Sequence, residues 1–149
     1  MIKEGLRLSF GGIGRLPRVV PEPGATFNDC FIPAGYIVGM SSWLMHRDST
    51  VFTNPERFDP ERWLKSPEEC RRLEHNMVAF TRGTRQCVGM PLAYTELYVT
   101  LGTLFRRFPH GLRVWRTTPE TMRDYEDFFS SYHPQNRRGE WFSAYMQKE

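Results

Sequence analysis

A stretch from Phe80 to Gly89, which reads F-T-R-G-T-R-Q-C-V-G, contains the residue types best suited to chemistry. Cys87 lies between Gly83 and Gly89 and two residues after Arg85, and a long segment with helical apolar periodicity follows it. Positive potential stabilises a thiolate, and the free N–H groups and dipole of a helix N-terminus provide such a potential. The spacing therefore predicts a loop that holds a thiolate at the start of a helix.

The same loop suits a flat, charged ligand that carries a metal. Gly83 and Gly89 have no Cβ, so they allow the backbone to turn sharply and to approach a planar molecule closely. Arg85 is a planar, permanent cation that binds carboxylates well. An iron porphyrin offers a metal for the sulfur of Cys87 and propionates for Arg85. The alternative is that Cys87 is a small buried hydrophobic residue, as free cysteines usually are.

The pattern F-x-x-G-x-R-x-C-x-G resembles the haem-binding loop of the cytochrome P-450 superfamily. The resemblance implies that the cofactor is haem b (iron protoporphyrin IX) and that Cys87 is the axial ligand of its iron. It also implies that the other four matched positions bind the cofactor, namely Phe80, Gly83, Arg85 and Gly89.

Two further motifs occur in the order that this family has. Glu4-x-x-Arg7 resembles its E-x-x-R motif, and P-E-R-W, which contains Arg62, resembles its P-E-R-F/W motif. The resemblance implies that Glu4, Arg7 and Arg62 form a buried structural triad behind the haem loop. Buried charges persist only when they are paired and hydrogen-bonded. The alternative is that Arg62 is a surface charge after a proline turn.

The resemblance implies an α+β, mainly α fold that corresponds to the C-terminal portion of the cytochrome P-450 fold. Residues 1–149 then form a single C-terminal fragment of that domain. Its expected segments are the end of the K helix (1–10), a β-hairpin (11–40), the meander region (41–79), the haem loop (80–89), the L helix (90–108) and a terminal β region (109–149).

Apolar residues from Ala93 to Phe108 recur at spacings of three and four, which predicts an amphipathic helix whose apolar stripe is core. Pro91 falls in its first turn, where a missing N–H costs little. In the alignment with the family, Arg18 falls where a second arginine often contacts a haem propionate; the alternative is a solvated strand arginine. His46 is expected to be a local hydrogen-bonding residue rather than a metal ligand.

Composition excludes several classes of protein. The net charge of +3, with arginines scattered among acids, indicates no nucleic-acid partner. Three cysteines without C-x-x-C spacing indicate neither a disulfide framework nor a zinc site. No signal peptide and no apolar run as long as a membrane span is recognisable, which predicts a chain without a membrane anchor whose location would be cytoplasmic or unknown.

The resemblance implies a haem-thiolate monooxygenase that inserts one oxygen atom of O2 into a small apolar organic substrate, in the secondary metabolism of filamentous fungi. Electrons would come from an NADPH-cytochrome reductase, and a full-length relative would lie at the endoplasmic reticulum membrane. The family's oxygen-activating helix precedes the K helix and is expected to be absent. The alternative is a non-catalytic truncated remnant with residual haem-binding capacity.

Overall fold

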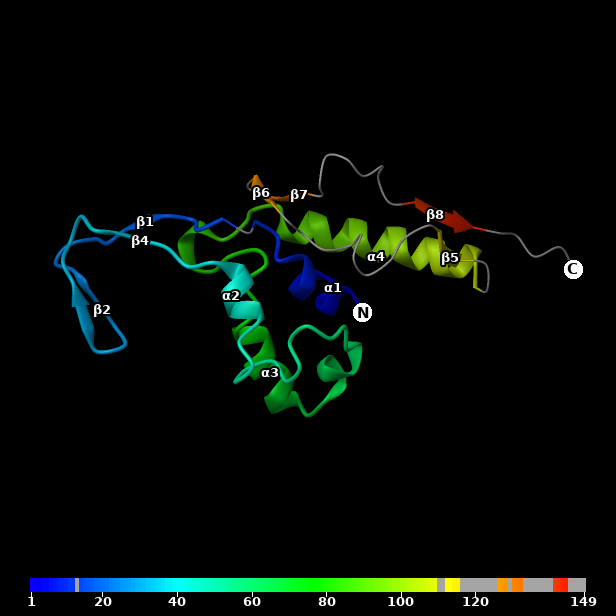
Figure 1. The fold of residues 1–149 in the computed structure, drawn as a ribbon, viewed down its shortest axis with the longest axis horizontal. Helices are drawn as coiled ribbons and strands as arrows, with labels where there is room; N and C mark the ends of the chain where they lie inside the picture. The colour runs from blue at the N-terminus through cyan, green and yellow to red at the C-terminus, as the bar shows by residue number, and fades with distance from the viewer. Residues whose placement is uncertain (13, 110–111, 116–125, 129, 133–140, 145–149) are drawn as a thin grey trace, which may run out of the picture. The chain divides into compact units, whose positions relative to one another are not determined.

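The computed structural model describes residues 1–12, 14–109, 112–115, 126–128, 130–132 and 141–144. The chain divides into two compact units, one of residues Lys3–Ala79 and one of Met1–Ile2 with Phe80–Glu149, and each is described by itself. The described elements are helices and strands, with most regular residues in helices (Figure 1). A mixed, mainly helical fold is therefore confirmed.

The described residues of the Lys3–Ala79 unit form three short α-helices, one 3-10 helix and two small antiparallel strand pairs. Its helical elements are α1 (Ile2–Ser9), α2 (Ser42–His46), η1 (Pro60–Leu64) and α3 (Pro67–His75). Its strands are β1 (Arg18–Val19), β2 (Ala25–Phe27), β3 (Cys30–Ile32) and β4 (Ile37–Val38).

The strands form two nested antiparallel pairs where the sequence predicts one hairpin. Strand β1 pairs with β4, and the β2–β3 hairpin lies between them in the chain (Figure 1). Asn28 and Asp29 join β2 to β3 with φ angles of 46° and 62°. Two consecutive left-handed residues are the pattern of a tight hairpin turn, and asparagine and aspartate tolerate it well.

The buried core of this unit is small and unusually polar. Its buried apolar side chains are Phe10, Val20, Phe52 and Leu73. Glu4, Arg7 and His46 are buried completely beside them, and Arg62 is 4% exposed. A core with this many polar groups is stable only if each of them has a partner.

Helix α1 ends at a backbone reversal that only glycine accommodates easily. Phe10 and Gly11 both have positive φ angles, of 58° and 62°. A Cβ on Gly11 would lie 2.4 Å from the carbonyl oxygen of Ala79, so the two backbones approach too closely for any side chain. The hydroxyl of Ser42 in α2 donates to the carbonyls of Phe10, at 2.8 Å, and Gly12, at 3.0 Å. These contacts connect the ends of α1 and α2.

The described residues of the Phe80–Glu149 unit form one long helix and two further strand pairs. Helix α4 covers Met90–Arg107, and a single 3-10 turn, η2 (Gly83–Arg85), precedes it. Strand β5 (Leu112–Trp115) pairs with β8 (Trp141–Ala144), and β6 (Glu126–Phe128) pairs with β7 (Ser130–Tyr132). Within the terminal region, residues 116–125 and 133–140 lie outside the described part of the chain.

The apolar stripe of α4 differs from its prediction. Ala93, Leu97 and Leu101 are half-buried, while Leu104 and Phe105 are 36% and 45% exposed, and none of the helix residues is buried. The prediction that the stripe is core is therefore wrong for the described residues. An apolar stripe becomes core only where another layer covers it, and periodicity alone does not supply that layer.

Candidate functional site

The Phe80–Gly89 loop closes on itself through backbone hydrogen bonds. The N–H of Cys87 donates to the carbonyl of Phe80 at 3.0 Å, and the N–H of Gln86 donates to the carbonyl of Gly83 at 3.0 Å. The hydroxyl of Thr81 donates to the carbonyl of Arg85 at 3.2 Å. The backbone of Cys87 is thus fixed by residues of its own loop.

The two glycines of the loop differ in why they suit their positions. Gly83 has a φ of 79°, the left-handed region that glycine adopts without strain. Gly89 has a φ of −79° and lies in the turn that the hydrogen bond from the N–H of Met90 to the carbonyl of Cys87 closes at 3.3 Å, so this turn needs no left-handed residue. A Cβ on Gly89 would lie 3.8 Å from the Sγ atom of Cys87, which is ordinary contact. Gly89 therefore keeps the space beside the sulfur clear.

Cys87 occupies the position that the sequence predicts, just before a helix. Gly89 caps α4, and Pro91 lies in its first turn. The carbonyl of Cys87 accepts the N–H of Met90 at 3.3 Å, and Gly89 accepts that of Ala93 at 2.9 Å. Cys87 is exposed, so the interpretation of it as a buried hydrophobic residue is wrong.

The donor set of the loop fits an iron porphyrin better than a bare metal ion. The thiol of Cys87 and the guanidinium of Arg85 are both exposed and accessible to a ligand. Among the described residues no group of three or more histidine, cysteine or acidic side chains could hold an ion by itself. A metal bound by one thiolate needs its other ligands from a cofactor, and a porphyrin supplies four ring nitrogens.

The ring of Phe80 joins the loop to α4. Its centroid lies 5.6 Å from that of Tyr94, and the Tyr94 ring lies 6.3 Å from that of Tyr98, one helical turn further on. The side-chain amide of Gln86 also contacts the sulfur of Met90, at 3.2 Å. The first turns of the helix and the loop are therefore packed as one piece.

A second group of predicted residues meets in the Lys3–Ala79 unit. Arg7 binds Glu4 through two hydrogen bonds, from Nε to Oε2 at 3.1 Å and from Nη2 to Oε1 at 2.9 Å. The Nε atom of Arg62, 58 residues further along the chain, donates to Oε1 at 3.0 Å. Since Arg62 is buried with Glu4, the interpretation of Arg62 as a surface charge is wrong.

The carboxylate of Glu4 has two further donors. The backbone N–H of Asp59 donates to Oε1 at 3.0 Å, and the indole N–H of Trp63 donates to Oε2 at 2.9 Å. Burial alone would raise the pKa of Glu4, but hydrogen bonds from Arg7, Asp59 and Trp63 and the charge of Arg7 lower that pKa to about 2. Glu4 is therefore ionised at every physiological pH.

Backbone carbonyls satisfy the outer nitrogens of the two arginines. Arg7 donates from Nη1 to the carbonyl of His46 at 2.8 Å, and Arg62 donates from Nη1 to that of Thr53 at 3.0 Å. Both also contact the carbonyl of Arg57, at 3.2 Å from Arg7 and 3.4 Å from Arg62. One buried carboxylate and three carbonyls thus hold two cations, which is the arrangement that makes buried charge tolerable.

Trp63 is a member of this cluster that sequence reasoning missed. The signal was present, because the residue after P-E-R is a tryptophan, which has an N–H donor that phenylalanine lacks. Its ring also lies 6.4 Å from that of Phe52 and 5.7 Å from the ammonium of Lys3. Phenylalanine at this position would keep a smaller aromatic ring and lose the hydrogen bond.

We expect Trp63→Phe to lower the free energy of unfolding of the chain by about 1.5–3 kcal/mol, the usual range for a hydrogen bond to a charged group. Urea unfolding followed by far-UV circular dichroism measures this change without using tryptophan emission. Trp43→Phe is the matched control, because Trp43 is 41% exposed and packs its ring against Arg47. Equal unfolding midpoints for both variants would contradict the role of the indole.

Arg18 lies on β1 and is exposed. Its Nη1 atom donates to the carbonyl of the preceding residue, Pro17, at 2.9 Å. This contact fits the solvated strand arginine that the sequence left open, and it leaves the rest of the guanidinium accessible. Arg18 and Arg85 belong to different units of the chain.

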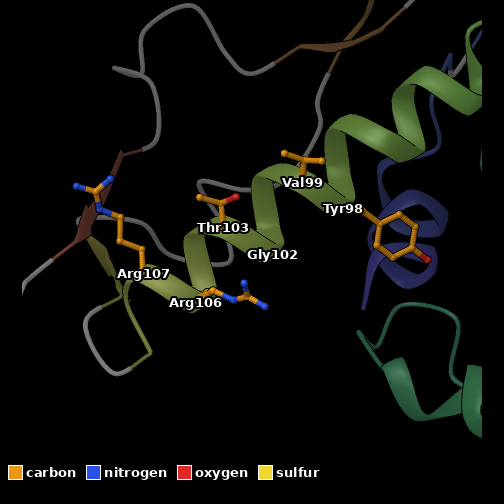
Figure 2. Close-up of a pocket in the computed structure, with 6 residues that line it drawn as sticks. All are labelled: Tyr98, Val99, Gly102, Thr103, Arg106 and Arg107. Carbon is orange, nitrogen blue, oxygen red and sulfur yellow. The ribbon is translucent and has the colours of Figure 1, made fainter.

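A hollow of about 540 Å³ lies along the second half of α4 (Figure 2). Its described lining comes from this helix alone and contains no thiol, histidine or carboxylate. The lining residues are Tyr98, Val99, Gly102, Thr103, Arg106 and Arg107. The hollow therefore lacks the donor chemistry of the Cys87 loop.

The described part of the chain contains no helix with the length and hydropathy of a membrane span.

Comparisons with known proteins place most of the chain in one family. The family model described as cytochrome P-450 matches residues 1–128. A tryptophan 6-hydroxylase of Fusarium equiseti is 48% identical over 127 residues, which are 85% of this chain and 25% of that protein. A fusicoccadiene C-8 hydroxylase of Alternaria brassicicola is 44% identical over 116 residues, 78% of this chain and 22% of that protein.

A cytochrome P-450 monooxygenase of Ascocoryne sarcoides is similar to the same degree, with 44% identity over 112 residues, 75% of this chain and 22% of that protein. The chain thus spans about a quarter of the length of the curated relatives that it matches. The relatives are fungal, as the sequence predicts.

Proposed function

This chain belongs to the cytochrome P-450 family, and from that premise we propose that it forms the thiolate-bearing part of a haem monooxygenase, with Cys87 as the iron ligand. The observation that carries the proposal is the exposed thiol of Cys87 in a loop whose backbone is already closed by hydrogen bonds. An accessible ligand atom on a fixed backbone needs little backbone reorganisation when a metal binds.

The remaining residues of the loop have separate tasks in this proposal. Arg85 binds a propionate through its planar guanidinium. Gly83 shapes the turn before the cysteine, Gly89 leaves room beside the sulfur, and Phe80 provides an apolar contact and the carbonyl that holds the N–H of Cys87. Haem held in this way supplies the activation of dioxygen that delivers one oxygen atom to an organic substrate.

The Glu4, Arg7 and Arg62 cluster performs no chemistry in this proposal. Its charges are buried and fully hydrogen-bonded, so they are not available to a substrate or a proton. Their task is to fix the backbone of α1 to that of η1 within the Lys3–Ala79 unit. The hydrogen bond from the N–H of Asp59 to Glu4, for example, joins residues that lie 55 positions apart in the sequence. A rigid frame of this kind is what a loop that binds a cofactor requires.

The family supports a proposal for the electron source and the substrate of the whole protein. Two relatives are a tryptophan 6-hydroxylase and a fusicoccadiene C-8 hydroxylase, which are named for two unlike organic molecules. We propose a small organic substrate of fungal secondary metabolism for the whole protein and an NADPH-cytochrome reductase as the electron donor. Neither partner is expected to contact the Glu4 cluster, because that cluster is buried.

Haem binding by the purified chain tests the proposal. We expect added haemin to bind at one equivalent, and the reduced complex with carbon monoxide to show the strongly red-shifted Soret band that a thiolate ligand produces. A band without the shift, or no saturable binding, would contradict the assignment of Cys87. The measurement needs no substrate and no reductase.

A turnover measurement distinguishes this proposal from the alternative, in which the chain binds haem but is not catalytic. Residues 1–128 would replace the matching segment of the Fusarium equiseti tryptophan 6-hydroxylase, to which this chain is 48% identical. We expect the chimera to hydroxylate tryptophan when reductase and NADPH are added. Haem binding with the thiolate spectrum but no product would favour the non-catalytic alternative.

A further inference from the structure

His46 is a completely buried histidine at the end of α2. Its ring lies between two aromatic side chains, with centroids 6.2 Å from those of Phe10 and Phe52. The Nδ1 atom lies 2.9 Å from the carbonyl oxygen of Arg7, and Nε2 accepts the backbone N–H of Val78 at 2.9 Å. Both ring nitrogens therefore bind backbone groups that are distant in sequence.

The two partners fix the tautomer of the ring. A backbone N–H can only donate, so Nε2 must be unprotonated to accept from Val78. A backbone carbonyl can only accept, so Nδ1 must carry the hydrogen toward Arg7. The contact between the two residues is reciprocal, because the Nη1 atom of Arg7 donates to the backbone carbonyl of His46 at 2.8 Å. The neutral, Nδ1-protonated form is the one that satisfies all three groups.

The residue that His46 holds lies directly before the Cys87 loop. Val78 is followed by Ala79, whose carbonyl oxygen lies against Gly11 so closely that a Cβ there would be only 2.4 Å away. The next residue, Phe80, is the one whose carbonyl accepts the N–H of Cys87 at 3.0 Å. The chain therefore enters the loop from a backbone that His46 binds at Val78 and that approaches Gly11 closely at Ala79.

We propose that His46 is a positioning residue for Cys87: its ring bridges the N–H of Val78 and the carbonyl of Arg7, and so fixes the backbone from which the chain enters the loop that carries the thiolate. This inference rests on the proposed function, in which Cys87 binds the haem iron. His46 touches neither cofactor nor substrate in this role and acts through the backbone of residues 78–80.

The titration of His46 makes its hydrogen bond with the N–H of Val78 depend on pH. Burial lowers the pKa of His46, the hydrogen bond to the Arg7 carbonyl opposes this, and the charge of Arg7 lowers it further, to about 4. Arg7 on α1 is the charged group that acts on the ring, since Phe10 and Phe52 carry no charge. A histidine whose pKa is depressed by folding stabilises the fold above its unfolded pKa of 6.5 and loses that contribution as the pH falls through about 4.

Protonation would place a hydrogen on Nε2, which then cannot accept from Val78. The hydrogen bond from the N–H of Val78 to His46 is therefore present at neutral pH and lost near pH 4. Glu4, the partner of Arg7, has a pKa of about 2, so its own titration lies below this window.

Amide hydrogen exchange on the full chain without haem tests the proposal directly. We expect His46→Phe, which keeps an aromatic ring and loses both hydrogen bonds, to speed exchange at Val78 and at Cys87 by about tenfold, the equivalent of one lost hydrogen bond. His46→Gln, whose amide retains one donor and one acceptor, should keep most of the protection against exchange. Because glutamine does not titrate, this protection should also persist near pH 4. Phe52→Leu is the matched control, because it loosens the same core without touching Val78.

A second readout uses the haem-loaded chain. We expect His46→Phe to lower the fraction of the carbon monoxide complex with the red-shifted thiolate band, and Phe52→Leu to leave it unchanged at equal stability. Faster exchange at Val78 with no change at Cys87 would overturn the proposal and leave His46 as a core residue only. If the chain bound no haem, the proposed function would fail, while the exchange data would still decide the role of His46.

Discussion

Replacing Cys87 with serine is expected to abolish the red-shifted carbon monoxide spectrum of the haem-loaded chain. A thiolate is a soft, electron-rich ligand, whereas a serine hydroxyl is not ionised at neutral pH and binds iron weakly. The loop itself should survive, because Cys87 is held through its backbone N–H and its side chain is exposed. The variant therefore isolates the sulfur atom.

The other two cysteines of the chain serve as controls for Cys87→Ser. Cys30 is exposed on β3, and Cys70 on α3 has its sulfur 3.3 Å from the carbonyl of Trp63. We expect Cys30→Ser and Cys70→Ser to keep the red-shifted band. Its persistence in Cys87→Ser, or its loss in either control, would move the iron ligand away from Cys87 and end the proposal as stated.

Neutralising Glu4 is expected to produce the largest loss of stability. Glu4→Gln removes the buried negative charge and turns an NH2 group toward the donors of Arg7, Arg62 and Trp63. An uncompensated buried charge typically costs about 3–5 kcal/mol. We expect a loss of that size in the free energy of unfolding, measured by urea denaturation at pH 7.

An exposed ion pair in the same unit provides the comparison. Lys65 and Glu69 lie 3.7 Å apart on the surface, with about half of each side chain exposed. Lys65→Gln should change stability by less than about 1 kcal/mol, since solvent screens such pairs. A loss for Glu4→Gln no larger than that of the control would show that the buried cluster does not stabilise this chain.

Lowering the pH should reduce the contribution of the same cluster to the free energy of unfolding gradually, whereas the Glu4→Gln substitution removes it at every pH. The pKa of Glu4 is depressed to about 2 from 4.5, so its stabilising contribution is present above pH 4.5 and is lost as the pH falls toward 2. This window lies below that of His46, which extends from 6.5 to about 4. The two steps of an acid titration therefore report on two different parts of the core.

The sequence allowed prediction of those parts of the site whose spacing is local. The ten positions of the Cys87 loop and the Glu4-x-x-Arg7 pair are each contained within a few residues, so their patterns are visible without a structure. Arg62 was assigned to the same cluster through the family motif. Its contact with Glu4 spans 58 residues, a distance in sequence that spacing alone does not bridge.

The roles of Trp63 and His46 could not be predicted because they depend on long-range partners. The indole of Trp63 reaches Glu4 across 59 residues, and the ring of His46 reaches Arg7 and Val78 across 39 and 32 residues. Local hydrogen bonding was expected for His46, whereas both of its bonds are non-local. The wrong prediction for the stripe of α4 has a related cause, because burial depends on what lies opposite.

The crowding of donors around the carboxylate of Glu4 limits how this chain can drift in evolution. Five hydrogen bonds converge on its two oxygens, and a carboxylate offers only about four lone-pair positions. Aspartate is one methylene too short to reach the same five donors, and glutamine would present a donor to donors. No single exchange at position 4 preserves the set. Replacing all three charges with apolar residues would leave the indole of Trp63, the N–H of Asp59 and three backbone carbonyls without these partners. Positions 4, 7 and 62 should therefore be retained together.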